Sequence, residues 1–435
     1  METISIREIA KNNSDEIEHL NSINKTTKTL LEYKKHRILI QELILNLFTN
    51  LRPLLKPLRI YALLNNLANS IVNPFIAFFT ASNNITGVLL AIVSSASTVF
   101  PGVIQYLLVN VAIRARKLIA ISTLGGGLLW IFVGLTSLYN SFLVLIYVII
   151  MLCLGAANFG WLLILEKISV TQRGRTLAYY NFYASIGGLL ATLITGFIVG
   201  DNLYLMRYFF IISGLIYVFD SFIIIKSDID VSFDGGKSLF ALTKAFLRKS
   251  KIRRFFLANF IFTFIWSMAW PIFPLAQVYK FHMNELQVAI INVISGVSTI
   301  ALQRLVGRLV DRSRRKIMFF GRFALATFPL AYALSNSVYQ IYISSLVSGF
   351  TNSASISYTA YLFDHSSYYE KRVNIALYNL FNAIAAILGS TISSIIFSAV
   401  STWFNIIFSI DIMLIAIGIL RILSSLLYLS IKEEI

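Results

Sequence analysis

Long apolar stretches separated by short polar connections run along most of the chain. An α-helix needs about 20 apolar residues to cross a hydrocarbon core of roughly 30 Å. Stretches of that length recur from residue 58 to residue 430, and only one connection between them, residues 226–253, is long. The pattern predicts an all-α membrane protein with twelve transmembrane helices. They are predicted at approximately 58–80, 86–109, 118–138, 141–165, 176–200, 204–225, 254–277, 285–306, 317–336, 338–363, 373–398 and 402–430.

The polar segments divide the chain into four parts. Residues 1–57 form a predicted cytoplasmic tail, and its apolar stretch from Ile38 to Leu51 is too short to span, so we expect an interfacial amphipathic helix there. The linker 226–253 separates six spans in residues 58–225 from six in residues 254–435. Its later part alternates apolar and basic residues at helical spacing, which is typical of a helix on an anionic membrane surface. Lipids of the inner leaflet are therefore an expected partner.

Composition and charge support this class of protein. Of 435 residues, 57% are hydrophobic and only 13% are charged, which is too little charge for the surface of a soluble protein of this length. The net charge of +17 would suggest nucleic-acid binding in a soluble protein. With the N-terminus placed inside the cell, however, all 37 Lys and Arg residues except Arg207 and Lys280 fall on the inner side. We therefore predict a cell-membrane protein with both termini cytoplasmic and no nucleic-acid partner.

The two halves of the chain resemble each other at a fixed offset. Glu166 and Asp364, which are 198 residues apart, each end the fourth span of their half, and Arg173 and Lys371 follow seven residues later. The same offset sets Arg114, Arg116 and Lys117 opposite Arg312, Arg314 and Arg315. Matches between charged loops are less expected by chance than matches between apolar spans. They predict two six-helix bundles related by an internal repeat, with a substrate path between them.

A basic loop between the eighth and ninth spans carries a recognisable signature. The run from Gly307 through Asp311 to Lys316 resembles the Gly-x-x-x-Asp-Arg-x-x-Arg-Arg loop of the major facilitator superfamily, with the second basic cluster one residue early. The resemblance implies the fold of that family and secondary transport. It also implies an inner-face charge latch, in which carboxylates pair with guanidiniums at helix ends. The latch residues would be Asp311, Arg312, Arg314, Arg315, Glu166, Arg173, Asp364 and Lys371. The alternative is that these basic loops only set the topology.

Two positions depart from the pattern of that family. The corresponding first-half loop, from Val109 to Lys117, lacks both the Gly and the Asp. In the fifth span, Ala191 and Thr192 stand where antiporters of the family carry Gly-Pro. The resemblance therefore supports a latch around Asp311 more than one in the first half, and it does not support an antiporter.

Polar residues within the predicted spans are the candidates for a substrate cavity, because such groups tend to face a bundle interior. Asn66, Asn69 and Asn73 share one face of the first span. The other one-face sets are Asn158 with Trp161, Trp266 with Trp270 and Gln277, Asn352 with Ser355, and Tyr378 with Asn382. The resemblance places the first, fourth, seventh and tenth spans around the cavity. The alternatives are hydrogen bonding between helices and, for the Trp residues, packing or an aromatic belt.

Three charged residues lie deeper than the loops. Asp411 falls about nine residues into the twelfth span, where we expect no cationic partner. It is therefore a candidate for proton coupling, and the alternative is a structural role as a buried, protonated or hydrogen-bonded group. Asp220, toward the inner end of the sixth span, is expected to meet an inner-face Lys or Arg. Arg421 is expected to extend its side chain to the interface.

No set of residues indicates catalysis. The four His are scattered, the single Cys153 excludes a cysteine metal site, and the run Gly235 to Ser238 lacks the earlier Gly that a phosphate-binding loop needs. We expect no enzyme activity, cofactor or metal. Since no Lys or Arg lies mid-membrane in the cavity-lining spans, the expected substrate is a small neutral or cationic organic solute, sugar-like or amphipathic.

The sequence thus predicts a monomeric secondary active transporter that works by alternating access. The alternative is a transporter-like sensor or scaffold that binds a ligand without moving it. In that alternative the long N-terminal tail would recruit a partner, and the departure in the first-half loop is the only feature that favours it.

Overall fold

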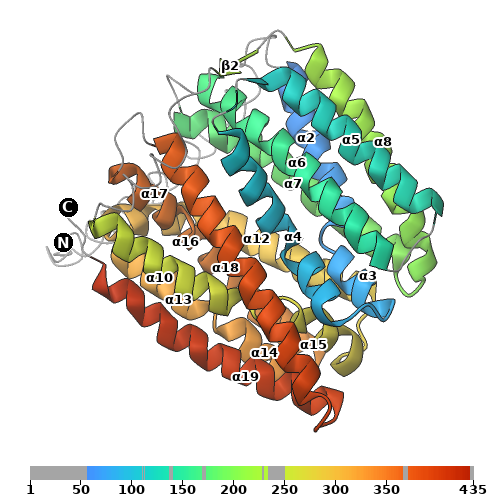
Figure 1. The fold of residues 1–435 in the computed structure, drawn as a ribbon, viewed down its shortest axis with the longest axis vertical. Helices are drawn as coiled ribbons and strands as arrows, with labels where there is room; N and C mark the ends of the chain where they lie inside the picture. Colours follow the sequence, from blue (N-terminus) through green and yellow to red (C-terminus); the bar gives the residue numbers. More distant parts are fainter. Residues whose placement is uncertain are drawn as a thin grey trace, which may run out of the picture. The chain divides into compact units, whose positions relative to one another are not determined.

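The computed structural model describes residues 56–109, 111, 113–136, 141–168, 173–227, 230–233, 250–365 and 371–431. Residues 57–435 form one compact unit. The predicted tail and its amphipathic helix lie outside the described residues. The compact unit is almost entirely helical (Figure 1).

The first half, residues 57–225, begins with a broken helix. Its helices are α2 (Lys56–Val72), α3 (Ile76–Ser82), α4 (Gly87–Leu108), α5 (Ala115–Thr136), α6 (Ser141–Ile168), α7 (Arg173–Val199), the 3-10 turn η2 (Leu203–Leu205) and α8 (Met206–Ile225). Pro74 lies between α2 and α3, where its ring and missing N–H interrupt the helical hydrogen bonds. The two-residue strands β1 (Ile113–Arg114) and β2 (Ser232–Phe233) pair antiparallel, so the start of the linker lies against the loop before α5.

The second half, residues 250–431, contains more interruptions. Its elements are α10 (Ser250–Ser267), α11 (Ile272–Leu275), the π-helical turn η3 (Ala276–Lys280), α12 (Glu285–Arg312), α13 (Arg314–Ala324), α14 (Thr327–Leu334), α15 (Val338–Ser345), α16 (Ser348–Ala354), α17 (Ile356–Asp364), α18 (Lys371–Val400), α19 (Ile406–Ser425) and η4 (Leu426–Ser430). Pro271 precedes α11, and Pro329 lies in the first turn of α14. Each proline removes one backbone donor from its helix.

Among the described residues, ten helices are long and apolar enough to cross a membrane, which makes this a multi-pass membrane protein. They match ten of the predicted spans to within a few residues at most ends. The fifth predicted span corresponds to α7, of which Ala184–Val199 qualifies as a shorter apolar helix. The tenth, predicted as one helix, is the succession α15, α16 and α17.

The helices pack both within each half and between the halves. In the first half, α5 lies against α6 and α8, and in the second half α10 lies against α18 and α19. The halves meet along two helix pairs, α4 with α18 and α7 with α12; α4 and α18 run side by side in Figure 1. Gly102 makes the first contact possible, because a Cβ atom there would lie 2.7 Å from the carbonyl oxygen of Asn379.

One end of the helices is closed by contacts between the halves. We call the end that carries the loops 113–117 and 312–316 the basic end. At the opposite end, a single apolar cluster joins Phe75 and Phe79 of the first half to Ile272 and Ala276 of the second. Three hydrogen bonds of the described residues add to it: the Tyr279 hydroxyl donates to Asn84 Oδ1 (3.3 Å), Asn284 Nδ2 donates to Asp201 Oδ1 (2.9 Å), and the Glu285 N–H donates to the Gly200 carbonyl oxygen (3.2 Å).

Candidate substrate site

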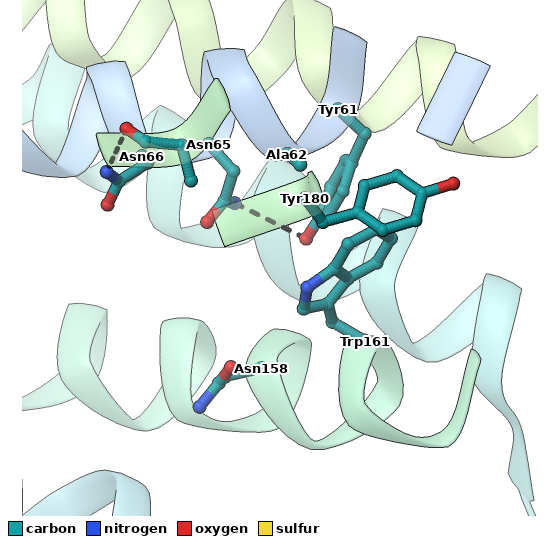
Figure 2. Close-up of a pocket in the computed structure, with 8 residues that line it drawn as sticks. Tyr61, Ala62, Asn65, Asn66, Asn158, Trp161 and Tyr180 are labelled. Carbon is teal, nitrogen blue, oxygen red and sulfur yellow. Dashed lines mark hydrogen bonds between the residues drawn. The ribbon is translucent and has the colours of Figure 1, made fainter. Parts of the chain in front are cut away.

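A cavity of about 160 Å³ lies among α2, α6 and α7, nearer the basic end (Figure 2). Its lining combines three aromatic rings, three carboxamides and two small side chains, and none of these groups is charged. The lining residues are Tyr61, Ala62, Asn65, Asn66, Asn158, Trp161, Tyr180 and Ala184. Ligand sites commonly combine apolar walls with a few placed polar groups, and this cavity has that composition.

The aromatic walls of the cavity are fixed by contacts among the rings. The Trp161 ring lies 5.0 Å from Tyr61, tilted by 47°, and 5.6 Å from Tyr180 in an edge-on arrangement. Tyr61 and Tyr180 are fully buried. Since each ring rests on another, Trp161 presents a preorganised surface to any molecule in the cavity.

The three carboxamides differ in how far they are already engaged. Asn66 Nδ2 donates to the Ala184 carbonyl oxygen, and Asn65 Nδ2 donates to the Tyr61 hydroxyl at 3.3 Å (Figure 2). Asn158 is exposed and makes no side-chain hydrogen bond to the described part of the chain. Asn158 can therefore offer both a donor and an acceptor to a solute.

Three of the predicted cavity residues meet in this cavity: Asn66, Asn158 and Trp161. Of the three residues predicted to share a face of the first span, only Asn66 lines the cavity. Asn73 accepts a hydrogen bond from the Tyr147 hydroxyl (2.7 Å), and Asn69 does not line the cavity.

Sequence reasoning missed Tyr61, Asn65 and Tyr180. Tyr61 and Asn65 are four residues apart on α2, so the helical spacing that singled out Asn66 would have revealed a second face.

Two further predicted residues belong to a polar network inside the second half. Asn382 Oδ1 accepts from Asn259 Nδ2 (2.5 Å) and from the Thr263 hydroxyl (3.1 Å). The Tyr378 hydroxyl donates to Asn259 Oδ1 (3.4 Å), and so does Arg322 Nη2 (2.9 Å). This network lies between the helices of the second half, and none of its residues lines the cavity.

Arg322 is a residue that sequence reasoning passed over. Its guanidinium is buried among four aromatic rings, with centroids at 4.2 Å for Tyr358, 4.6 Å for Phe262, 5.6 Å for Trp266 and 5.7 Å for Tyr428. Such faces attract a cation through their negative quadrupole. The signal in the sequence was its position five residues inside the predicted ninth span.

The remaining predicted cavity residues form contacts between or within helices. Gln277 Nε2 donates to the Tyr332 hydroxyl (3.0 Å), and Asn352 Nδ2 donates to the Thr299 hydroxyl (3.1 Å). Trp266 and Trp270 pack edge to face at 5.1 Å, and the Ser355 hydroxyl donates to the Asn352 carbonyl (2.6 Å). These contacts match the structural alternative for the same side chains.

Arg421 does not extend to the interface as expected. Its side chain is fully buried, and its Nη1 and Nη2 donate to the carbonyl oxygens of Leu325 (2.7 Å) and Trp266 (2.5 Å). The ordinary partner of the Leu325 oxygen would be the N–H of residue 329, which is a proline. Arg421 thus satisfies carbonyls that the helix breaks leave free.

The expectation that Asp411 lacks a partner is wrong. Lys280 Nζ lies 2.6 Å from Asp411 Oδ1 and also donates to the carbonyl oxygens of Tyr332 (3.0 Å) and Ala333 (2.6 Å). Because α19 begins at Ile406, Asp411 lies in the second turn, nearer the helix end than predicted. The pairing removes the premise on which a proton-coupling role for Asp411 was based.

The expectation for Asp220 is also wrong. Its side chain is fully buried, and neither carboxyl oxygen has a hydrogen-bond partner, a Lys or an Arg within the described residues.

At the basic end, two residues of the predicted latch come together: Arg314 forms an ion pair with Asp364. Asp311 and Arg312 are exposed and form no ion pair within the described part of the chain, and the same holds for half-buried Arg315. Glu166 is half-buried at the end of α6. The side chains of Arg173 and Lys371 lie outside the described residues.

The first-half counterpart of Arg314 uses a different acid. Arg116 Nε lies 3.8 Å from Asp230 Oδ2, in the linker, and its backbone N–H donates to Asp230 Oδ1 (3.1 Å). Lys167 Nζ donates to the Asp230 carbonyl (2.7 Å). The linker therefore supplies the carboxylate that the first-half loop lacks.

Comparison with known proteins identifies this fold as that of membrane transporters. The nucleoside transporter NupG superimposes with a TM-score of 0.70 at 13% identity, over 88% of this chain and all of that one. A D-xylose–proton symporter gives 0.63 at 16% identity, over 87% of this chain and 98% of that one. A POT family transporter in complex with a thioalcohol-conjugated peptide gives 0.66 at 11% identity, over 86% and 95%.

One sequence comparison points to a family within this class. Residues 255–434 match the family model of the Major Facilitator Superfamily, and no curated protein matches the chain. Together with the fold, this match agrees with the resemblance at Gly307 to Lys316, and both point to a transporter of the major facilitator superfamily.

Proposed function

We propose that the protein is a secondary active transporter that moves a small neutral or cationic organic solute by alternating access. The observation that carries this proposal is the cavity at Trp161, with its aromatic walls and uncharged carboxamides. Rings of a solute can pack on Trp161, and hydroxyl, amide or amine groups can bond to Asn158. A strong anion would find no counter-charge among the lining residues.

The proposal includes the arrangement in the membrane. Twelve spans in two six-helix bundles, with both termini cytoplasmic in the cell membrane, place the basic end inside. Contacts at the opposite end, such as that between Asn284 and Asp201, would then close the outer side. The cavity at Trp161, nearer the basic end, would be reached from the cytoplasm, as alternating access requires of an inward-facing state.

Flux in proteoliposomes tests this function. The probes are radiolabelled uridine, D-xylose and dialanine, and ethidium as an organic cation, each measured by counterflow. Trp161→Ala should weaken the affinity for the transported probe about tenfold, equivalent to ~1.4 kcal/mol. Trp403→Ala is the matched control, because Trp403 is 83% exposed at the opposite end and should leave affinity unchanged.

The same experiment separates transport from the sensor alternative. The specific observation that favours a sensor is the attachment of the linker at Asp230 to the loop before α5, which ties together elements of the basic end. Saturable binding of a probe without counterflow would support a sensor and overturn the transport proposal. Equal affinity in the Trp161→Ala variant would show that the solute binds elsewhere.

A further inference from the structure

The buried carboxyl group of Asp220 is not used by anything described so far. It lies on α8 with a fully buried side chain, and both oxygens lack a hydrogen-bond partner within the described residues. Burying a carboxylate without a compensating charge is costly, so the surroundings favour the neutral, protonated group. A group held in this way can take up and release a proton when its surroundings change.

Within the described residues, the helices packed around Asp220 bring no cation to it. Helix α8 packs on α2, where the Ser213 hydroxyl donates to the Ala68 carbonyl oxygen (2.8 Å). Two helical turns toward the basic end, Asp220 comes opposite Tyr61 and Asn65, and Tyr217 lies near it on its own helix. On α2 the charged residues are confined to Lys56 and Arg59, near its start. The packed helix α5 carries no charged residue after Lys117.

The same two α2 side chains also line the cavity at Trp161. Tyr61 and Asn65 are joined by the 3.3 Å hydrogen bond from the Asn65 amide to the Tyr61 hydroxyl. Asp220 therefore lies directly behind the cavity wall, one layer of side chains away. A carboxylate there would accept from the amide and the hydroxyl, whereas a neutral carboxyl group has an O–H of its own to donate. The charge of Asp220 thus determines which donors face the solute.

We propose that Asp220 is the proton-binding group that couples the cavity to a proton gradient; this rests on the proposed transport function. One proton adds to a carboxylate oxygen of Asp220, an O–H bond forms, and the group becomes neutral. On release, that O–H bond breaks, the proton passes to water in the cavity, and Asp220 becomes an anion that draws Asn65 and Tyr61 toward it. No electrons are transferred, and Tyr61 and Asn65 act as positioning residues.

Infrared titration of the full chain in lipid nanodiscs tests the protonation directly, without a substrate. The wild type should show a carbonyl band of a buried protonated carboxyl group that disappears as the pH is raised. Asp220→Asn should remove this component. Glu285→Gln is the matched control, because Glu285 is also a buried acid with an unpartnered oxygen but lies at the opposite end. Persistence of the titrating component in Asp220→Asn overturns the proposal.

The link to the cavity is tested by two further variants. Asn65→Ala and Tyr61→Phe should each shift the midpoint of the Asp220 titration, and a midpoint unmoved in both overturns the coupling. If Asp220→Asn does not fold, Asp220→Glu replaces it, and the carboxyl band should move in frequency; an unchanged band again overturns the proposal.

Transport gives the functional readout, with the probe that the wild type moves. Asp220→Asn should lose accumulation driven by a pH gradient while it continues to exchange probe by counterflow. Retained gradient-driven accumulation overturns the inference. If the wild type moves none of the probes, the transport proposal fails for them, while the infrared titration still decides whether Asp220 binds the proton.

Discussion

The two halves of the protein differ in the ionisable groups that they bury. The second half holds the cations Lys280, Arg322 and Arg421, each of which bonds to a carbonyl or a carboxamide, and a buried acid, Glu285, at the start of α12. The first half buries the single carboxyl group of Asp220, which has no such bond within the described residues.

The difference follows from where the helices are broken. In the second half, interruptions near Pro271 and Pro329 release backbone carbonyls inside the membrane, where no water can satisfy them. Arg421 provides the missing donors and is therefore structural. In the first half, α5 and α8 are continuous, so their backbone carbonyls are satisfied and Asp220 serves no such purpose. A buried ionisable group without a structural role is the better candidate for function.

The largest expected effect is the loss of stability in Arg421→Met. The substitution leaves the carbonyls of Leu325 and Trp266 without donors, at a cost of about 1–3 kcal/mol for each. The cation no longer has to be buried, which offsets part of this cost. The apparent melting temperature in detergent should fall clearly.

Two variants make this prediction specific. Arg421→Lys retains the charge but has one donor group in place of two, so it should lie between wild type and Arg421→Met. Lys316→Met removes a cation from an exposed position and should leave the melting temperature within error. A melting temperature of Arg421→Met equal to that of Lys316→Met would contradict the structural role.

A smaller effect is expected for Lys280→Met. Lys280 bonds to the carbonyls of Tyr332 and Ala333 near the end of α14, and it pairs with Asp411. The Asp411 side chain is 28% exposed, so water can replace part of what is lost, and we expect about 1 kcal/mol of destabilisation.

The Lys280 prediction can be checked with a double-mutant cycle on thermal unfolding. Asp411→Asn should destabilise the wild type but not the Lys280→Met background, because the carboxylate has no partner left to lose. Equal effects in both backgrounds would show that the pair contributes nothing.

The sequence predicted most of the helices but not their breaks. Apolar length placed the fourth span at 141–165, and α6 is Ser141–Ile168. The tenth span, predicted as one helix, is three, because hydropathy is insensitive to the local hydrogen bonds that end α15 and α16. Hydropathy therefore did not reveal the backbone carbonyls that the breaks leave without a donor. For this reason the side chain of Arg421, which bonds to them, was predicted to extend to the interface.

The candidate site was predicted only in part, because sequence spacing does not show how the helices pack on one another. Helical spacing identifies which residues share a face, so Asn66 and Asn158 were found. It does not show where neighbouring helices cross, and Asn73 therefore proved to bond to Tyr147. We predicted a cationic partner for Asp220, because a charged residue near the end of a span usually has one. Only the packing of α2 on α8 shows that Asp220 has no such partner within the described residues.

The basic end offers a second comparison, between two arginines at equivalent repeat positions. Arg314 pairs with Asp364 at the end of α17, whereas Arg116 pairs with Asp230 of the linker, which also accepts from the backbone N–H groups of Arg116 and Val231. The pair of Arg116 with Asp230 is also fixed by these backbone hydrogen bonds. The two pairs should respond differently to salt.

The smallest predicted effects sharpen this second comparison. Asp364→Asn should cost about 0.2–1 kcal/mol, since the pair is partly exposed. That cost should vanish at high salt, which screens exposed charges. Asp230→Asn should behave similarly, because its amide oxygen still accepts from the two N–H groups. Asp230→Ala should cost more and keep most of its effect at high salt, because neutral hydrogen bonds are not screened. Melting temperatures of the three variants at low and high salt decide this, and a salt-sensitive Asp230→Ala effect would mean that the linker is held by charge alone.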